Sequence, residues 1–318
     1  MENFADRLIE AVERKGTPAC VGLDPQFRLI PGEIRRRAVD SAATGAQAAC
    51  VAAFCQEVIE IVAPLVAIVK PQVAFFEQLG TSGMLAYADA VRRARQHGLI
   101  VIGDVKRGDI SSTAEAYAAG HLREAHGDGH FTVDAVTVNP YLGSDGVRPF
   151  IEAANETGRG VFVLVKTSNK SSADFQDLKL ADGDELFVKV AAKVKDWGSA
   201  VIGKRGYSSV GAVVGATHPQ QAVRLRALMP GVPFLVPGYG AQGAGAADVM
   251  PCFKEDGLGA VVNSSRGVIY AWTRSPYKEQ FGEERWRDAI EAAARDMISD
   301  LHQALQQARK LQAGPPRT

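Results

Sequence analysis

The sequence predicts a single-domain α/β protein with the (β/α)8 architecture of a TIM barrel. Eight short apolar runs rich in β-branched residues recur along the 318-residue chain, and helical patterns separate them. Strands that are apolar on both faces are typical of a parallel sheet buried between helices. Eight such units at this length favour a closed barrel over an open doubly wound sheet.

The predicted strands are short runs dominated by valine, isoleucine, leucine and alanine. In chain order they cover residues 19–23, 66–69, 99–102, 135–138, 161–165, 210–214, 233–236 and 259–262. Each run ends at a polar residue, a glycine or a proline, as expected where a strand passes into a loop.

Apolar residues at helical spacing predict the helices between these strands. An opening amphipathic helix is indicated by Phe4, Leu8, Ile9 and Val12. Further helical patterns cover residues 46–62, 84–94, 113–124, 186–194 and 220–228, and a long amphipathic helix covers residues 284–311.

The chain has no segment with the composition of an interdomain linker, so we expect one barrel domain over residues 1–312. Residues 168–184 are polar and are predicted to form a loop insertion suited to act as a lid. Residues 313–318 include Gly314-Pro315-Pro316 and are predicted to form a disordered tail.

The composition argues against several classes of partner. Lysine plus arginine and aspartate plus glutamate both number 36, so no basic field indicates nucleic-acid binding. No apolar stretch approaches the ~20 residues of a membrane span, and the N-terminus lacks an apolar signal core. The four cysteines show neither zinc-binding spacing nor a disulfide framework. We therefore expect a cytoplasmic protein without a bound metal, a membrane or a nucleic acid.

The most informative segment is V-I-G-D-V-K-R-G-D-I-S-S-T, residues 101–113. Strand side chains repeat every two residues, so Asp104 and Lys106 are predicted to share a face, with Cα atoms ~6–7 Å apart. Arg107-Gly108 breaks the strand, and Asp109 opens the next segment. A lysine between two carboxylates keeps its proton and is suited to protonating a carbanion. The alternative is a solvated turn with a surface salt bridge, which is a common and weak interaction.

Polar groups follow nearly every predicted strand, and in a barrel the carboxyl ends of all strands meet on one rim. These groups are Asp24, Lys70, Asp104 with Lys106, Asn139, Lys166 with Thr167 and Ser168, Thr217, Pro237-Gly238, and Asn263 with Ser265 and Arg266. Their convergence predicts an active site at that rim, whereas loop polarity without function would be scattered.

The loop after the seventh strand, from Pro237 to Gly243, contains the dinucleotide-binding pattern G-x-G-x-x-G. A dinucleotide site also needs an acid ~20 residues further on, at the end of the next strand, where this chain has Asn263. In a barrel, the loops after the seventh and eighth strands commonly bind phosphate instead. Gln242 can donate its amide hydrogen there, and Arg266 can bind phosphate through two hydrogen bonds. The alternative for Arg266 is a solvated surface arginine.

Taken together, these residues resemble the orotidine 5′-phosphate decarboxylase family, in its longer bacterial branch. The matching stretches are V-G-L-D-P, V-K-P-Q-V-A-F-F-E, D-V-K-R-G-D-I-S-S-T, T-V-N-P-Y-L-G, V-K-T-S-N, P-G-Y-G-A-Q-G and N-S-S-R-G, and they run from residue 21 to 267. The resemblance implies decarboxylation of orotidine 5′-phosphate to UMP in de novo pyrimidine synthesis, without a cofactor.

The same resemblance implies roles for individual residues. Lys106 would protonate C6 of the pyrimidine, and Asp104 would lie beside the substrate carboxylate. Asp109 would reach into the neighbouring subunit's site, which implies a homodimer with shared active sites. Lys70 would link the two aspartates and the ribose. The implied substrate contacts are Asp24 and Thr113 with the ribose hydroxyls, Thr113 again across the dimer, Ser168 with the pyrimidine, and Pro237, Gln242 and Arg266 at the lid and phosphate.

Three alternatives stay open from the residues. Magnesium-dependent sugar-phosphate decarboxylases of the same superfamily carry a similar D-x-K-x-x-D motif. Lys70 could form a Schiff base in an aldolase, or it could be a structural lysine of the rim. A catalytically inactive phosphate-binding barrel is the third alternative, although a mere binder gains little from burying adjacent carboxylates.

Overall fold

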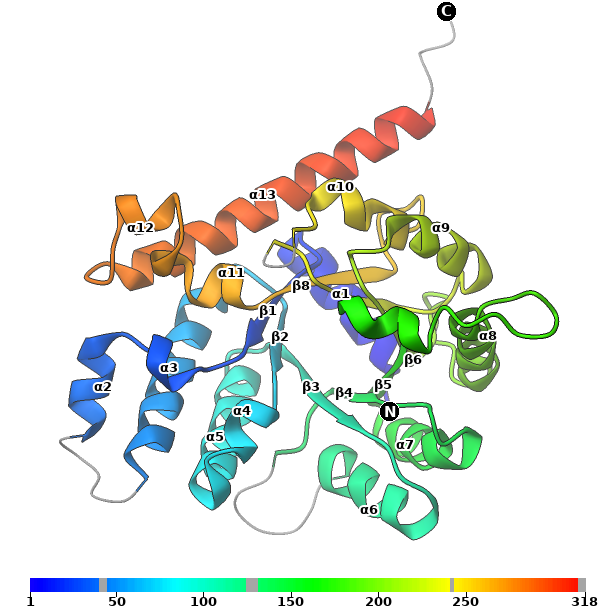
Figure 1. Cartoon of the computed structure of the whole chain (residues 1–318), viewed down its shortest axis with the longest axis horizontal. Coiled ribbons are helices and arrows are strands. Elements are labelled where there is room, and N and C mark those ends of the chain that lie inside the picture. Colours follow the sequence, from blue (N-terminus) through cyan, green and yellow to red (C-terminus); the bar gives the residue numbers. More distant parts are fainter. Residues whose placement is uncertain (40–44, 124–130, 241–242, 314–318) are drawn as a thin grey trace, which may run out of the picture.

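The computed structural model describes residues 1–39, 45–123, 131–240 and 243–313. Its eight strands form a closed parallel barrel in which each strand pairs with the next along the chain and β8 pairs with β1. The strands are β1 Ala19–Leu23, β2 Ile68–Pro71, β3 Ile100–Arg107, β4 Ala135–Val138, β5 Gly160–Lys166, β6 Val210–Val214, β7 Phe234–Pro237 and β8 Ala260–Ser264. The predicted (β/α)8 architecture is therefore confirmed (Figure 1).

The helices surround the barrel. They are α1 Phe4–Lys15, α2 Gly32–Val39, α3 Ala46–Val62, α4 Ala74–Glu77, α5 Gly80–Gln96, α6 Ser111–Leu122, α7 Ser144–Thr157, α8 Leu186–Gly198, α9 Pro219–Leu228, α10 Ala246–Val249, α11 Arg266–Ile269, α12 Tyr277–Gln280 and α13 Trp286–Ala313. None of the helices in the described part of the chain is long and apolar enough to cross a membrane.

Helix α7 is absent from the sequence prediction. Its segment contains Gly146 and Pro149, two of the weakest helix-forming residues, so propensity does not indicate a helix there. Packing forms it instead, because Val147 and Phe150 are fully buried against the barrel. At the other end of the chain, α13 reaches Ala313, the first residue of the predicted tail, and residues 314–318 lie outside the described part.

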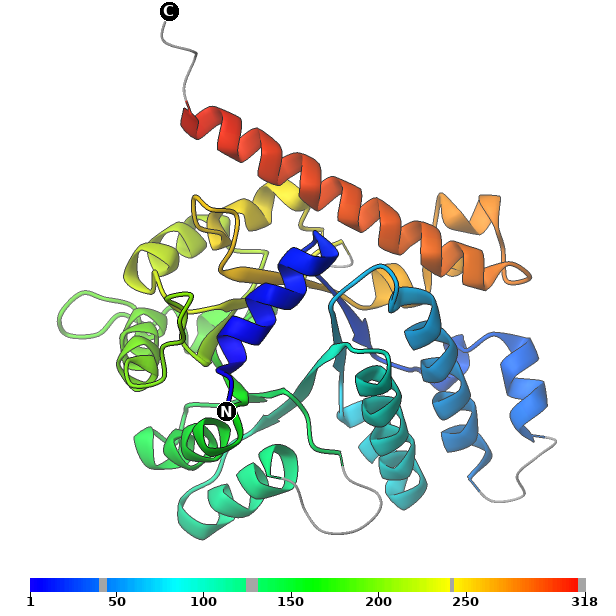
Figure 2. The same ribbon diagram turned by 180° about the vertical axis from the view of Figure 1, so that it is seen from behind.

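The interior of the barrel is a compact apolar core closed at one end by α1. Inward-facing side chains such as Ile68, Ile102 and Phe162 pack there together with Phe4 and Leu8 of α1. The Phe4 and Phe162 rings meet edge to face, with centroids 6.0 Å apart. Figure 2 shows α1 lying across this end of the barrel. Because α1 covers the end at which the strands begin, the interior opens only where the strands end.

The pairing of β3 with β4 is irregular at the open end of the barrel. Gly103 pairs with Val136, and the next pair is Arg107 with Val138, so β3 advances four residues while β4 advances two. The additional residues form a bulge that contains Asp104 and Lys106. Strand β3 thus extends to Arg107, beyond the apolar run that predicted it, and it ends at the expected Arg107-Gly108 break.

Candidate active site

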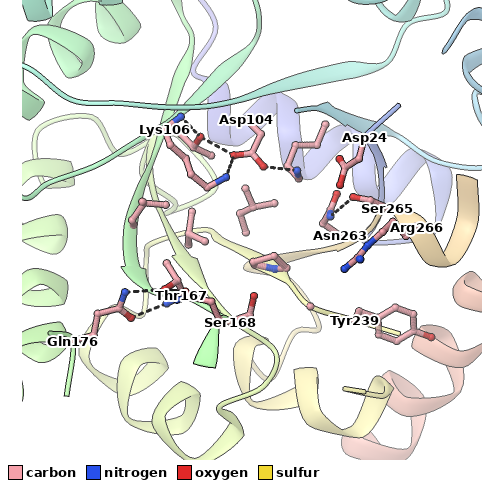
Figure 3. A pocket seen from close by; sticks show the side chains of 18 residues that line it. Asp24, Asp104, Lys106, Thr167, Ser168, Gln176, Tyr239, Asn263, Ser265 and Arg266 are labelled. Carbon is pink, nitrogen blue, oxygen red and sulfur yellow. Dashed lines mark hydrogen bonds and ion pairs between the residues drawn. The ribbon is translucent and has the colours of Figure 1, made fainter. Parts of the chain in front are cut away.

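A cavity of about 480 Å³ lies at the carboxyl ends of the strands. Every strand contributes to its lining, either directly or through the residue that follows it. The lining residues are Asp24, Lys70, Asp104, Lys106, Thr137, Leu164, Thr167, Ser168, Asn169, Gln176, Val213, Leu235, Pro237, Gly238, Tyr239, Asn263, Ser265 and Arg266 (Figure 3). The predicted convergence of strand-end polar groups on one rim is confirmed for most of the set.

Asp104 is the centre of the charged part of this cavity. Its Oδ1 accepts a hydrogen bond from Lys106 Nζ at 2.5 Å, and its Oδ2 accepts one from Lys70 Nζ at 2.6 Å. Gln72 Nε2 also donates to Oδ2, at 3.0 Å. Burial alone would raise the pKa of Asp104, but Lys70 and Lys106 outweigh burial and hold that pKa well below its ordinary value. The carboxylate is therefore ionised.

Lys70 is buried beneath Asp104, with 4 % of its surface exposed. Burial by itself lowers the pKa of Lys70, yet the Asp104 and Asp24 carboxylates more than offset it and raise that pKa above its ordinary value. The Lys70 amine is therefore charged. A Schiff base requires a neutral amine, so this environment does not favour the aldolase alternative.

Asp24 follows β1, the strand next to β2, and lines the cavity on the Lys70 side (Figure 3). Its Oδ1 is buried and has no hydrogen-bond partner among the described residues. Burial raises the pKa of Asp24, with Lys70 and Ser265 opposing the rise. Ser265 approaches because Gly22 lacks a side chain: a Cβ there would lie 1.9 Å from Ser265 Oγ. A buried carboxylate oxygen without a partner is suited to accept a hydrogen bond from a ligand hydroxyl.

The insertion after β5 folds back to form one wall of the cavity. Thr167 N donates to Gln176 Oε1 at 2.9 Å, and Gln176 Nε2 donates to Thr167 Oγ1 at 2.8 Å (Figure 3). Next to Gln176, Asp177 forms a 2.6 Å ion pair with the fully buried Lys166. Ser168 lies in this wall, as predicted. Lys166 does not, because a β5 irregularity between Leu164 and Lys166 shifts the register and the Lys166 side chain packs near Phe187 of α8.

The loops after β7 and β8 form the side of the cavity farthest from Lys106. Pro237 and Arg266 both line it, and the Arg266 guanidinium points inward (Figure 3). Tyr239 connects this loop to the last helix, since its hydroxyl donates to Asp300 Oδ2 of α13 at 2.5 Å. Gln242, the other predicted phosphate contact, lies outside the described residues.

Two predicted residues are not part of this cavity in a single chain. Asp109 lies partly exposed on the loop between β3 and α6, and its carboxylate accepts a hydrogen bond from Ile110 N at 2.8 Å. Thr113 is exposed in the first turn of α6. Neither lines the pocket that contains Lys106.

Several residues at this site were not predicted from the sequence, chiefly Thr137, Gln72 and Gln176. Thr137 is a single hydroxyl in the apolar strand A-V-T-V, two residues after the inward-facing Ala135. Strand periodicity could therefore have pointed to it. Gln176 could not be found this way, because only the fold brings it back to Thr167.

Comparisons with known proteins relate the chain to one family. Residues 17–275 match the model of the Orotidine 5'-phosphate decarboxylase / HUMPS family. An orotidine 5′-phosphate decarboxylase of Rhodopirellula baltica is 45% identical over 302 residues, which cover 95% of this chain and 99% of that one. The solved orotidine 5′-phosphate decarboxylase of Leishmania donovani has a TM-score of 0.72 at 32% identity, covering 96% of this chain and 99% of that chain. The chain also matches Leishmania donovani UMP synthase (TM-score 0.74, 33% identity), with 96% of this chain but only 57% of that chain covered.

Proposed function

The chain belongs to the orotidine 5′-phosphate decarboxylase family and decarboxylates orotidine 5′-phosphate to UMP, and we propose that Lys106, Asp104 and Lys70 carry out this chemistry. The observation that carries the proposal is the buried Asp104 carboxylate held between two ammonium groups at 2.5 and 2.6 Å. Relatives that are 38% to 45% identical share the decarboxylase name, and no finding supports the magnesium-dependent sugar-phosphate alternative.

Decarboxylation breaks the bond between C6 and the substrate carboxylate, so CO₂ leaves and the electron pair stays on C6. That pair lies in the ring plane, where no carbonyl is positioned to delocalise it, so the site must stabilise it electrostatically. In our proposal Lys106 Nζ stabilises this charge and then gives its proton to C6. The Lys106 side chain is 47% exposed, which allows water to return the proton. Asp104 lies beside the substrate carboxylate and raises the energy of the ground state.

The remaining cavity residues would hold the nucleotide. Asp24, with its buried and unpartnered Oδ1, is suited to a ribose hydroxyl. Ser168 would hydrogen-bond the pyrimidine, and Arg266, Pro237 and Gln242 would contact the phosphate. Phosphate binding at this distance from C6 can drive orientation of the substrate as well as affinity.

We further propose that the protein is a homodimer whose active sites are shared, with Asp109 and Thr113 completing the site of the other copy. Their position outside the cavity of their own chain supports this. Large apolar side chains are exposed beside them: Ile110 at 48% and, on the loop before α7, Tyr141 at 80% and Leu142 at 48%. The first turn of α7 lies close to the Asp109 segment, since a Cβ on Gly146 would lie 2.8 Å from Asp109 O. An exposed apolar surface of this kind is typical of an interface between copies.

A cytoplasmic location is part of the same proposal. All four cysteines are buried and free, as is usual in a reducing compartment.

The reaction can be tested by following the loss of orotidine 5′-phosphate absorbance after mixing with purified protein and no added metal. We expect turnover that is unchanged by EDTA and by borohydride added together with substrate. Loss of turnover with EDTA would show that the reaction needs a metal ion, and inactivation by borohydride would support a Schiff base at Lys70. No turnover under any condition would support an inactive binding barrel.

A further inference from the structure

Thr137 lies on β4 opposite the bulge of β3, and its side chain is almost completely buried, with 1 % of the residue exposed. The bulge removes the regular strand partners of the β3 backbone at this point. The Thr137 hydroxyl oxygen replaces them, because it accepts hydrogen bonds from Val105 N and from Lys106 N, each at 3.0 Å. The Thr137 side chain thus satisfies two consecutive backbone N–H groups of the bulge, those of Val105 and Lys106.

These two bonds also fix the direction of the hydroxyl proton. A threonine hydroxyl has one hydrogen and two lone pairs. Both lone pairs are used by the backbone donors, so the hydrogen is left for Asp104 Oδ1, which lies 3.0 Å away. Asp104 Oδ1 therefore accepts hydrogen bonds from Thr137 and Lys106, while Oδ2 accepts hydrogen bonds from Lys70 and Gln72. The carboxylate has four directed donors and no freedom to rotate.

The backbone of Lys106 shows why such support is needed. Its φ is +45°, in the left-handed region, and Ser111 is the only other non-glycine residue of the described chain with positive φ. A side-chain-bearing residue persists in this conformation only where the surroundings hold it, and such residues cluster at functional sites. In an unbulged strand the backbone would carry the Lys106 side chain along a different direction.

We propose that Thr137 is a positioning residue for the decarboxylation: it holds the β3 bulge and orients the Asp104 carboxylate, and through both it aims the Lys106 ammonium at C6. Thr137 does not touch the reacting carbon in this account. The inference rests on the proposed roles of Lys106 and Asp104. It adds Thr137 of β4 to the residues of β2 and β3 that are proposed to act in the reaction.

The test is a comparison of Thr137→Val with Thr137→Ser. Valine keeps the shape of threonine but leaves two backbone N–H groups and one Asp104 oxygen without a partner, whereas serine keeps the hydroxyl. For the valine variant we expect kcat to fall on the order of 10- to 100-fold, the range for losing hydrogen bonds to a charged group. The dissociation constant of UMP should stay within about threefold of wild type, because Thr137 acts on the proton donor and not on nucleotide binding. The serine variant should recover most of kcat.

A matched control is Thr17→Val. Thr17 is also buried, at 2 % exposed, and its hydroxyl also accepts a backbone N–H, from Ala19 at 3.2 Å, but it lies at the closed end of the barrel. We expect wild-type kcat from this control even if its thermal midpoint falls. A second readout is exchange of the C6 hydrogen of UMP with deuterium from solvent, which reports proton transfer at C6 and should slow in Thr137→Val in parallel with kcat.

Wild-type kcat in Thr137→Val would overturn the inference, as would equal losses in Thr137→Ser or an equal loss in the Thr17 control. If Thr137→Val does not fold, Thr137→Ala, which removes the hydroxyl without adding apolar bulk, is judged by the same criteria. Failure of the proposed function looks different: Lys106→Ala would then keep its turnover. A Lys106→Ala variant without turnover beside a fully active Thr137→Val would overturn the role of Thr137 alone.

Discussion

Lys106 Nζ lies 2.5 Å from Asp104 Oδ1, yet the two side chains differ in exposure, at 47% for the lysine and 9% for the aspartate. The carboxylate is held from below by Lys70 and stays within the barrel, while the ammonium reaches it from the solvent side. An ammonium in this position is fixed by charge and can still exchange its proton with water.

We expect Lys106→Ala to lose turnover while keeping its fold and its affinity for UMP. Removing a general acid that also stabilises the carbanion should lower kcat on the order of 10³-fold or more. Steady-state kinetics, circular dichroism and UMP titration measure the three properties. Lys204→Ala is the control, since Lys204 is an exposed lysine beside α1 at the closed end of the barrel. Near-normal kcat in Lys106→Ala would remove the residue from its proposed role.

The two carboxylates that flank Lys70 should titrate in different pH ranges. Burial raises the pKa of Asp24, whereas Lys70 and Lys106 outweigh burial at Asp104 and lower its pKa. As the pH falls, Asp24 should therefore take up a proton first and weaken ribose binding, so KM rises while Asp104 is still ionised. The measurement is KM and kcat from about pH 4.5 to 8 for wild type and Asp24→Asn. A KM profile with the same acid limb in both proteins would assign that limb to another group, such as the substrate phosphate.

Sharing of the active site can be tested by mixing two inactive variants. In a hybrid of Asp109→Ala and Lys106→Ala, one of the two sites would combine an intact Lys106 with an intact Asp109 from the other copy. Random exchange makes about half of the dimers hybrid, so roughly a quarter of wild-type activity should return. No recovery, with subunit exchange demonstrated by mixed tags, would mean that Asp109 acts within its own chain.

The buried ion pair behind the cavity wall gives a prediction about stability. Lys166 is fully buried and pairs with Asp177, so Asp177→Ala leaves a buried ammonium without its carboxylate. Because Asp177 is itself 32% exposed and water can partly replace it, we expect a loss of about 2 kcal/mol in the free energy of unfolding. The control is Asp182→Ala in the same insertion, where the partner Lys189 is 3.9 Å away and both side chains are exposed. We expect the control to change by less than about 0.5 kcal/mol. Equal urea midpoints for the two variants would contradict the prediction.

Much of the barrel and of the charged site follows from the sequence, because strand periodicity and strand-end polarity are local signals. Lys70, Asp104 and Arg266 lie in or shortly after the carboxyl-terminal parts of their strands, where the sequence placed them, and all three line the cavity. The bulge at Lys106 and the inward turn of Gln176 are different, since both depend on contacts with residues distant in the chain. Lys166 is the instructive error: it ends a strand like the others, but a register shift in β5 places it outside the cavity.

Arg266 should discriminate between a phosphorylated substrate and the bare nucleoside. It lines the cavity on the side farthest from Lys106, and loss of a charge-assisted bond to phosphate costs about 1.5–3 kcal/mol, or roughly ten- to a hundredfold. Arg266→Ala should therefore lower kcat/KM for orotidine 5′-phosphate by that factor and leave the nucleoside nearly unaffected. Part of the loss should appear in kcat, because phosphate binding also orients the substrate for the reaction.

The comparison needs kcat/KM for both substrates in wild type, in Arg266→Ala and in Arg274→Ala. Arg274 is an exposed arginine that also follows β8 but does not line the cavity, so its variant should treat both substrates as wild type does. Equal proportional losses for nucleotide and nucleoside in Arg266→Ala would show that Arg266 supports the fold of the β8 loop and does not bind phosphate. A loss confined to the nucleotide, absent from the Arg274 control, assigns the phosphate to Arg266, because the two substrates differ only in that group.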